Sequence, residues 1–214
     1  MSRAQRSTLV LIRHAHTELA GTFCGGADPP LSAKGVAQLA ELKRRLEAWP
    51  LTHIFSSDLV RARQTAESIA QSRKLPIQYL ESLRELALGS WEGLDWDHVV
   101  ARDPEYAQRW LELHPSIPAP GGENFADFAL RIQDAITRIA AQTGNGCAAV
   151  LTHAGVIRTF LGGVACARGI PCDLAPCDYA SCWEVWREDD RWGLPGKTLS
   201  TAVVDCAVRP SIGD

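Results

Sequence analysis

The chain has 214 residues, which is enough for one large domain with a developed core and too few for two ordinary domains joined by a linker. A formal net charge of −3, from 22 basic and 25 acidic residues, excludes a general affinity for nucleic acid or for an anionic membrane. The amino-terminal segment is basic but is followed by only a short apolar run, so it does not match a signal peptide. We therefore expect a single cytoplasmic domain over residues 1–214 whose partner is a small molecule.

The cysteines do not form a disulfide or metal pattern. Seven is an odd number, and free thiols are expected in a reducing compartment. Cys166, Cys172, Cys177 and Cys182 cluster, with five, four and four residues between them, but a C-x-x-C pair is missing. We expect no metal site here.

The segment Leu9 to Ile12 is a short apolar run that leads directly into Arg13 and His14. Such a run is typical of a buried strand, and ligands of α/β proteins bind at the carboxyl ends of strands. An imidazole can act as a nucleophile, and a guanidinium fork matches phosphate oxygens. A second apolar run, residues 148–151, leads in the same way to His153. An Arg-His pair alone could be incidental, but the repeated design indicates phosphoryl chemistry.

Helices and strands alternate along the rest of the chain. Ser32 is a candidate cap for a helix that ends near Trp49, and Arg61 and Arg63 lie in a helix that follows a short strand. Two residues apart, these arginines cannot share a face, so one should point to the site and the other to solvent. The remaining expectations are strands at 54–57, 76–80, 148–152, 181–186 and 200–204, and helices at 58–66, 123–143 and 156–164. This predicts an α/β three-layer sandwich with a mostly parallel central sheet, helices on both faces and antiparallel strands at one edge.

Residues 86–122 break the pattern and are predicted to form a small helical insertion. Acidic side chains outnumber basic ones in it, and Trp91, Trp96, Tyr106 and Trp110 are spaced among them. The aromatic rings could form a platform for a ligand, but packing inside a small helical subdomain is the more common use.

Ordered blocks along the chain match a known pattern. They are Arg13-His14-Ala15, Pro30-Leu31-Ser32 with Gly35, Ser56-Ser57-Asp58-Leu59 with Arg61-Ala62 and Thr65-Ala66, Glu85, Gly89 with Trp91-Glu92-Gly93, Gly122-Glu123, and Thr152-His153-Ala154-Gly155. On these blocks the chain resembles the histidine phosphatase superfamily, the phosphoglycerate mutase-like clan. Within the clan, the segment Pro120 to Phe125 and the pair Cys182-Trp183 are similar to those of α-ribazole phosphatases, which act in cobalamin biosynthesis.

The resemblance implies roles for individual residues. His14 would be the nucleophile, with one ring nitrogen donating a hydrogen bond to the backbone and the other taking the phosphoryl group. Arg13, Arg61 and His153 would surround the phosphate, and Glu85 would protonate the leaving alcohol and then deprotonate the attacking water. Taken singly, Arg61 could be a surface residue, Glu85 a solvated carboxylate and His153 a core histidine. Their joint occurrence favours a site.

Further contacts to substrate are expected from Thr17, Trp91 and the backbone N–H of Ala154, with Arg63, Ser57 and Glu123 as lesser candidates. The resemblance implies neither a cofactor nor a metal, and it leaves the oligomeric state open between monomer and homodimer.

Two positions depart from the family pattern. The family commonly has Gly after the nucleophile and Asn seven residues after the leading Arg, whereas this chain has Ala15 and Ala20. Ala15 implies that the backbone there has no need of a positive φ, and Ala20 removes an amide expected near the phosphate.

The acidic, aromatic insertion favours a phosphatase over a mutase, which needs extra cations around a doubly charged sugar acid. Hydrolysis of α-ribazole 5′-phosphate, with its benzimidazole-ribose portion against Trp91 or Trp96, is the preferred hypothesis. Its alternatives are a broad-specificity phosphatase, a mutase-type phosphotransferase and a phosphate-binding module without turnover.

Overall fold

A computed structural model describes residues 6–168 and 177–194. The predicted succession of strands and helices is confirmed, with boundaries that differ by a few residues. In chain order the elements are β1 Arg6–Arg13, α1 Ala33–Leu46, β2 His53–Ser56, α2 Val60–Arg73, β3 Ile77–Tyr79, the short 3-10 helices η1 Glu81–Leu83 and η2 Gly89–Trp91, α3 Trp96–Arg102, α4 Pro104–Leu113, α5 Phe125–Thr143, β4 Cys147–Thr152, α6 Ala154–Ala167, β5 Cys182–Glu188 and β6 Arg191–Gly193.

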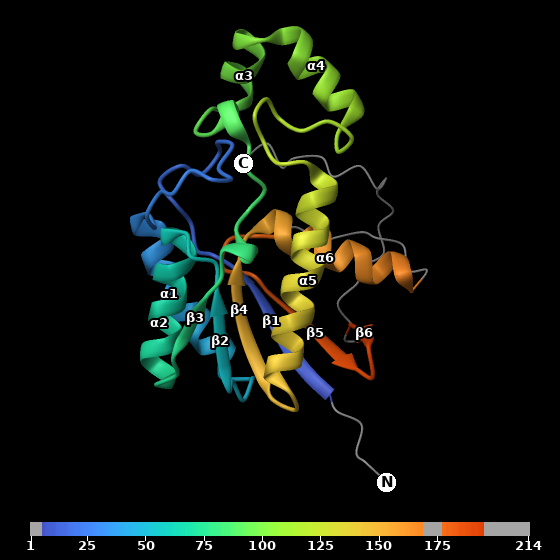
Figure 1. The fold of residues 1–214 in the computed structure, drawn as a ribbon. Helices are drawn as coiled ribbons and strands as arrows, with labels where there is room; N and C mark the ends of the chain where they lie inside the picture. Colours follow the sequence, from blue (N-terminus) through green and yellow to red (C-terminus); the bar gives the residue numbers. More distant parts are fainter. Residues whose placement is uncertain (1–5, 169–176, 195–214) are drawn as a thin grey trace.

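The described strands form one six-stranded sheet in the order β3-β2-β4-β1-β5-β6 (Figure 1). Strands β1 to β4 are parallel to one another, and β5 pairs antiparallel with β1 and with β6. The expected antiparallel strand at 181–186 is therefore confirmed as β5, while the expected strand at 200–204 lies outside the described residues. The parallel strands place their carboxyl ends at one edge of the sheet.

Helices cover both faces of the sheet, as predicted. Leu9 and Leu11 of β1 belong to a core shared with α5 and α6, whereas Val10 and Ile12 belong to a second core shared with α1 and α2. Side chains alternate between the faces of a strand, so an uninterrupted apolar run supplies both cores at once. The first helix begins as expected, because the Ser32 hydroxyl accepts a hydrogen bond from the Gly35 N–H.

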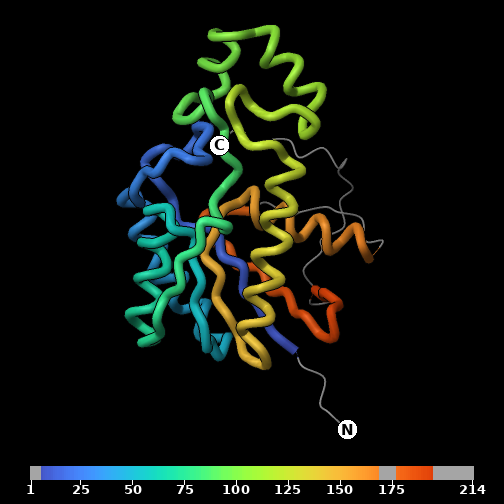
Figure 2. Tube along the Cα trace, viewed as in Figure 1, coloured from blue at the N-terminus to red at the C-terminus, as the bar shows by residue number. Residues whose placement is uncertain are grey.

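The insertion forms a helical cap above the carboxyl ends of the strands (Figures 1 and 2). Asp95 and Asp103 directly precede its helices α3 and α4 and cap them, because their side chains accept backbone hydrogen bonds from the first turns. It has a hydrophobic core of its own, built around Trp91 and Trp110, that is separate from the two cores of the sheet. The segment after β1 reaches up to the cap and pairs with it through Phe23.

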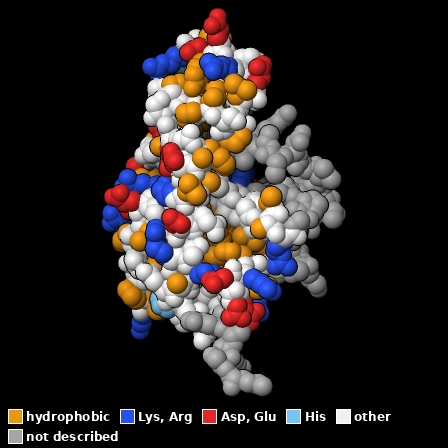
Figure 3. All heavy atoms as spheres, turned by 45° about the vertical axis from the view of Figure 1, so that its right-hand side comes forward, with side chains coloured by type: hydrophobic (Ala, Val, Ile, Leu, Met, Phe, Trp, Pro, Cys, Tyr) orange, Lys and Arg blue, Asp and Glu red, His pale blue; other side chains and the backbone are white. Residues whose placement is uncertain are grey.

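The surface carries no strong local excess of one charge on the face drawn in Figure 3, where acidic and basic side chains are interspersed. Among the helices that the structure describes, none has both the length and the apolar character needed to cross a bilayer.

Candidate active site

The central pair of parallel strands brings the two predicted histidines together. β1 and β4 pair in register up to Arg13 and Thr152, and the His14 N–H donates to the Thr152 carbonyl at 2.9 Å. The next residue of each strand is a histidine, and the centroids of the His14 and His153 rings are 5.1 Å apart. Two segments that lie far apart in the sequence therefore meet at one point on the sheet edge.

His14 is held in the orientation that a nucleophile needs. Its Nδ1 lies 2.8 Å from the Ala15 carbonyl oxygen, which can only accept, so Nδ1 carries the proton and Nε2 keeps its lone pair. Burial of the ring, followed by the charges of Arg61 and Arg13, lowers the pKa of His14 well below its usual value. The imidazole is thus neutral and nucleophilic. Ala15 is buried and does not adopt a positive φ, as expected from its side chain.

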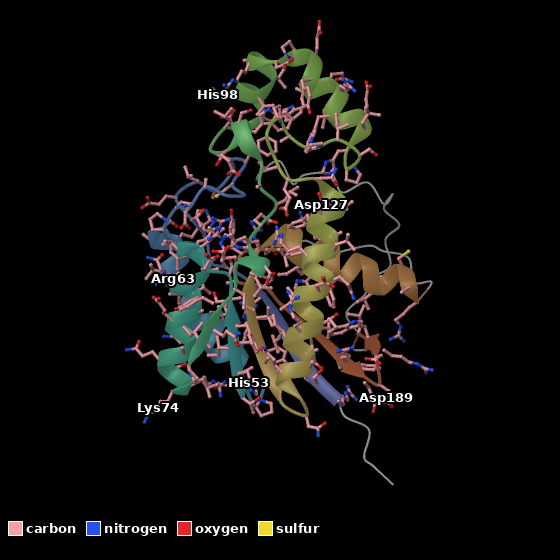
Figure 4. All side chains as sticks on the ribbon, in the orientation of Figure 1. His53, Arg63, Lys74, His98, Asp127 and Asp189 are labelled. Carbon is pink, nitrogen blue, oxygen red and sulfur yellow. The ribbon has the colours of Figure 1, made fainter. Side chains whose placement is uncertain are left out.

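Arg13 and Arg61 supply the positive charge beside this ring. Arg13 donates to the Cys177 carbonyl at 2.6 Å and lies under the Tyr179 ring, with 3.7 Å between its guanidinium carbon and the ring centroid. Arg61 is fully buried at the start of α2. The buried Nε atoms of both arginines have no hydrogen-bond partner in the part of the chain that the structure describes. Arg63, by contrast, is exposed on the outer side of α2 (Figure 4), as the spacing argument required.

His153 is a second neutral imidazole. It is fully buried, its Nε2 lies 2.9 Å from the Ser57 hydroxyl, and its Nδ1 has no hydrogen-bond partner among the described residues. Burial lowers its pKa well below the usual value, and the charge of Arg61 and the proximity of His14 act in the same direction. In this structure the two arginines therefore carry the charge, and His153 offers polar nitrogen atoms.

The Glu85 carboxylate binds at the start of α6. One oxygen accepts the Gly155 N–H at 2.8 Å, and the other accepts the Leu86 N–H at 3.0 Å. The approach requires glycine, because a Cβ atom at position 155 would lie 2.2 Å from Glu85 Oε1. The start of α6 therefore brings two site residues together. His153 directly precedes the helix, and the Glu85 carboxylate is hydrogen-bonded to its second residue.

The other predicted contact residues are placed as follows. Thr17 is buried and pairs with Leu31 in an isolated bridge, and Ala154 is the first residue of α6, next to His153. Trp91 packs inside the cap, which is the more common use of such rings and the alternative to contact with substrate. It is 3 % exposed, and rings of the cap core and of Phe23 surround it.

Two contributors were missed by the sequence reasoning. Tyr179 stacks on Arg13, and its ring centroid lies 5.6 Å from that of His14 and 5.0 Å from that of His16. Gly155 was noted only as part of a motif, although its missing side chain makes room for Glu85. No local signal marks Tyr179, because its approach to Arg13 arises from the tertiary fold.

A loop over residues 24–27 connects the site to the cap. Arg61 donates to the carbonyls of Ala27 and Gly25 at 2.5 and 2.8 Å. The Glu92 carboxylate accepts the N–H groups of Gly25, Gly26 and Ala27 at 2.9, 2.7 and 3.0 Å. Arg61 of the site thus binds the carbonyl groups of this loop, and Glu92 of the cap binds its N–H groups.

The cysteines that the structure describes, Cys24, Cys147, Cys166, Cys177 and Cys182, are free, whereas Cys172 and Cys206 lie outside the described residues. Within the described part of the chain there is no group of three or more His, Cys, Asp or Glu side chains placed to hold a metal ion.

Comparison with known proteins identifies the family. Residues 9–196 match the model of the histidine phosphatase superfamily, branch 1. The adenosylcobalamin/α-ribazole phosphatase of Salmonella typhimurium is 31% identical over 155 residues, which cover 72% of this chain and 77% of that protein. Phosphoserine phosphatase 1 of Hydrogenobacter thermophilus is 31% identical over 147 residues, covering 68% of this chain and 70% of that protein.

Solved structures agree. A mycobacterial glucosyl-3-phosphoglycerate phosphatase, Rv2419c, superimposes with a TM-score of 0.75 at 26% identity, covering 90% of this chain and 97% of that one. The expected fold is therefore confirmed. The sequence match and the shared fold agree with the paired histidines at the sheet edge, and the chain belongs to the histidine phosphatase superfamily.

Proposed function

We propose that the protein hydrolyses phosphate monoesters through a phosphohistidine at His14, and that α-ribazole 5′-phosphate is its natural substrate. The observation that carries the first part is the hydrogen bond from His14 Nδ1 to the Ala15 carbonyl, which leaves Nε2 free beside two guanidinium groups. Buried polar nitrogens on Arg13, Arg61 and His153, which have no hydrogen-bond partner among the described residues, are suited to the oxygens of a phosphoryl group.

The reaction has two balanced steps. In the first, the Nε2 lone pair of His14 forms a bond to phosphorus, the P–O ester bond breaks, and Glu85 gives its proton to the departing alcohol oxygen. In the second, the Glu85 carboxylate takes a proton from water, the water oxygen bonds to phosphorus, and the P–N bond breaks to release phosphate. Arg13 and Arg61 stabilise the charge on the phosphoryl oxygens in both steps.

The substrate proposal rests on the relatives and on the rings at the site. Relatives with about the same identity are named for α-ribazole phosphate and for phosphoserine, so identity alone does not select the alcohol. The Tyr179 ring lies beside His14, and the His16 ring lies beside Tyr179. These two rings replace Trp91 and Trp96 as the surface against which a benzimidazole ring would pack. The acidic cap disfavours the doubly charged acid that a mutase must retain.

Trapping the intermediate tests the reaction. After brief mixing with a ³²P-labelled monoester, the protein should carry an acid-labile, alkali-stable label that is lost in His14→Ala and kept in His98→Ala. His98 is an exposed histidine on the cap (Figure 4) and serves as the control. A phosphate-binding module without turnover would show binding but neither label nor released alcohol.

A panel of esters tests the substrate. We expect kcat/KM for α-ribazole 5′-phosphate to exceed the values for L-phosphoserine and for p-nitrophenyl phosphate by at least about 10-fold, since selectivity is a difference in transition-state binding. Equal values would refute the α-ribazole proposal and leave the phosphatase proposal standing.

A further inference from the structure

Consecutive carbonyl groups lead up to Glu85, and side chains of neighbouring elements hold each of them. The carbonyls of Ser82 and Arg84 both accept hydrogen bonds from one terminal nitrogen of Arg131, each at 3.0 Å. The Leu83 carbonyl between them accepts the Thr152 hydroxyl at 2.8 Å. The backbone that presents Glu85 is therefore fixed from α5 and from β4.

Arg131 is itself oriented by a carboxylate. Its Nε and its other terminal nitrogen donate to the two oxygens of Glu123 at 2.9 and 2.7 Å, which is the bidentate geometry of a strong charge-assisted pair. The side chains of Arg131 and Glu123 are only 25% and 21% exposed, so water screens the pair weakly. One end of the guanidinium thus binds Glu123, and the other end binds the two carbonyls.

A further ion pair holds the same segment from the opposite side. Arg84, directly before Glu85, makes a two-point contact with Asp58, in the loop that leads into α2. The Arg84 side chain is 43% exposed, which is more than the Arg131 side chain. Asp58 binds the side chain of Arg84, whereas Arg131 binds the backbone of the segment. Of the two, Arg131 has the stronger hold on the position of residue 85.

We infer that Arg131 is a positioning residue for Glu85, and that Glu123 keeps Arg131 in the orientation this requires. The inference rests on the proposed function, in which Glu85 protonates the leaving alcohol. Among the described residues, the hydrogen bonds of Arg131 go to the chain before Glu85 and to Glu123, and not to His14 or the Glu85 carboxylate. Proton transfer requires hydrogen-bond reach, and a misplacement of about 1 Å can cost about 100-fold in rate. Releasing two of the three carbonyls should allow a shift of this kind.

The leaving group of the ester distinguishes positioning from a general structural role. An alkyl phosphate needs a proton from Glu85 as its P–O bond breaks, whereas p-nitrophenyl phosphate releases a stable phenolate without one. The ratio kcat/KM covers only the steps up to departure of the alcohol, so it isolates this proton transfer from the later attack of water. In Arg131→Met we expect kcat/KM to fall by about 10-fold or more for an alkyl phosphate and by less than about 3-fold for p-nitrophenyl phosphate.

Arg187→Met is the matched control. Arg187 on β5 also donates to a carbonyl of α5, that of Thr137 at 3.4 Å, and also pairs with a carboxylate, that of Asp190. Its side-chain hydrogen bonds within the described part of the chain do not involve the segment before Glu85. Its loss should leave the ratio of the two kcat/KM values unchanged, so that any selectivity seen in Arg131→Met is specific to that segment.

Glu85→Gln distinguishes the proposed acid role of Glu85 from the positioning role of Arg131. It should show the same selective loss as Arg131→Met, and a larger one. Should Glu85→Gln be selective while Arg131→Met lowers both esters equally or neither, the positioning inference is overturned and the proposed function stands. Should Glu85→Gln itself lower both esters equally, the acid role in the proposed function fails, and the inference fails with it.

Glu123→Gln keeps the experiment decisive if Arg131→Met does not fold. It retains the guanidinium but removes the negative charge of Glu123 and one of the two acceptor oxygens that orient Arg131. A smaller loss with the same preference for the alkyl phosphate supports the inference, and an unselective loss or none at all overturns it.

Discussion

At the scale of single residues, the site depends on a position where a side chain is missing. Gly155 lies at the start of α6, and the Glu85 carboxylate occupies the space that a Cβ atom would take. The backbone N–H of Gly155 is also one of the two donors to that carboxylate. The glycine therefore both admits Glu85 and binds it.

We predict that Gly155→Ala lowers kcat/KM for alkyl phosphates by about 10-fold or more, because the added methyl group and Glu85 Oε1 cannot both occupy their places. Steady-state kinetics with purified protein measure the effect. Gly163→Ala is the control on the same helix, where a Cβ meets no atom within 4 Å. That change should preserve activity and stabilise the helix by roughly 0.5–1 kcal/mol. Equal activity of the two variants would contradict the steric argument.

The buried histidines should make folding stability depend on pH. Because the folded state lowers the pKa of both His14 and His153, the unfolded chain binds more protons below pH about 6.5. We predict that the free energy of unfolding falls as the pH falls from about 6.5 toward the folded-state pKa values, by up to about 1.4 kcal/mol per pH unit for each histidine. Above that window neither ring is charged in either state.

Urea unfolding at a series of pH values measures this slope in wild type and in His153→Gln, which should show a shallower dependence. His53→Gln is the control for the loss of an imidazole, since His53 lies at the opposite end of its strand from the site (Figure 4) and should change the slope less. An unaltered slope in His153→Gln would contradict the prediction.

At the scale of elements, the loop over residues 24–27 is held from two directions. Glu92 of the cap binds its N–H groups and the Leu88 N–H, at 2.8 Å, while Arg61 binds its carbonyls. Because both the N–H groups and the carbonyls of this loop are hydrogen-bonded, the loop has few alternative conformations. We therefore expect the loss of the Glu92 contacts to alter the position of the Arg61 guanidinium, which lies beside His14.

We predict that Glu92→Gln lowers the free energy of unfolding by about 1–3 kcal/mol, because a single amide oxygen cannot serve the N–H groups that the carboxylate binds. It should also raise KM for monoesters, since Arg61 loses a rigid support. Chemical denaturation and steady-state kinetics test the two parts. Glu112 is exposed on α4 and, among the described residues, is hydrogen-bonded to Gln108 alone, so Glu112→Gln should be nearly neutral. A neutral Glu92→Gln would show that the loop does not depend on the carboxylate.

The elements show where sequence patterns suffice and where they do not. Apolar periodicity predicted α1 and α5, uninterrupted apolar runs predicted β1 and β4, and α2 and α6 were predicted from their place directly after a strand. The start of α6 was placed at Val156, whereas the helix begins at Ala154, because His153 makes no side-chain cap that a pattern could reveal. Strand β6, Arg191–Gly193, was missed because Trp192 is its single apolar side chain, whereas β3, which is equally short, has Ile77 and Tyr79 on either side of Gln78.

At the scale of the whole molecule, the described residues form three hydrophobic cores that stabilise different parts of the protein. Two lie on the faces of the sheet and fix the strand ends, and the third belongs to the cap. The predicted site residues His14, His153, Arg13 and Arg61 follow from strand ends and one adjacent helix. Glu85 was assigned only through the family resemblance, and Tyr179 not at all, because both reach the site through segments of irregular structure.

We predict that Trp110→Ala loosens the cap while the sheet stays folded. Trp110 is 2 % exposed, and truncating such a residue costs about 3–5 kcal/mol. Hydrogen exchange followed by mass spectrometry should show faster exchange over residues 91–119 and unchanged protection in β1 and β4. The control is Leu130→Ala, because Leu130 is 66% exposed and its loss should change exchange little in either region. Uniformly faster exchange in Trp110→Ala would show that cap and sheet unfold as one unit.

The pairing of β1 with β4 has a consequence for the order in which the protein acquires activity. Strand β1 is made first, but its neighbour in the sheet ends only at Thr152. The ribosome must therefore add residues 15–153 before His14 gains the neighbouring imidazole ring of His153. Until then the emerging chain has His14 without His153, so the proposed phosphoryl site assembles only when β4 has paired with β1.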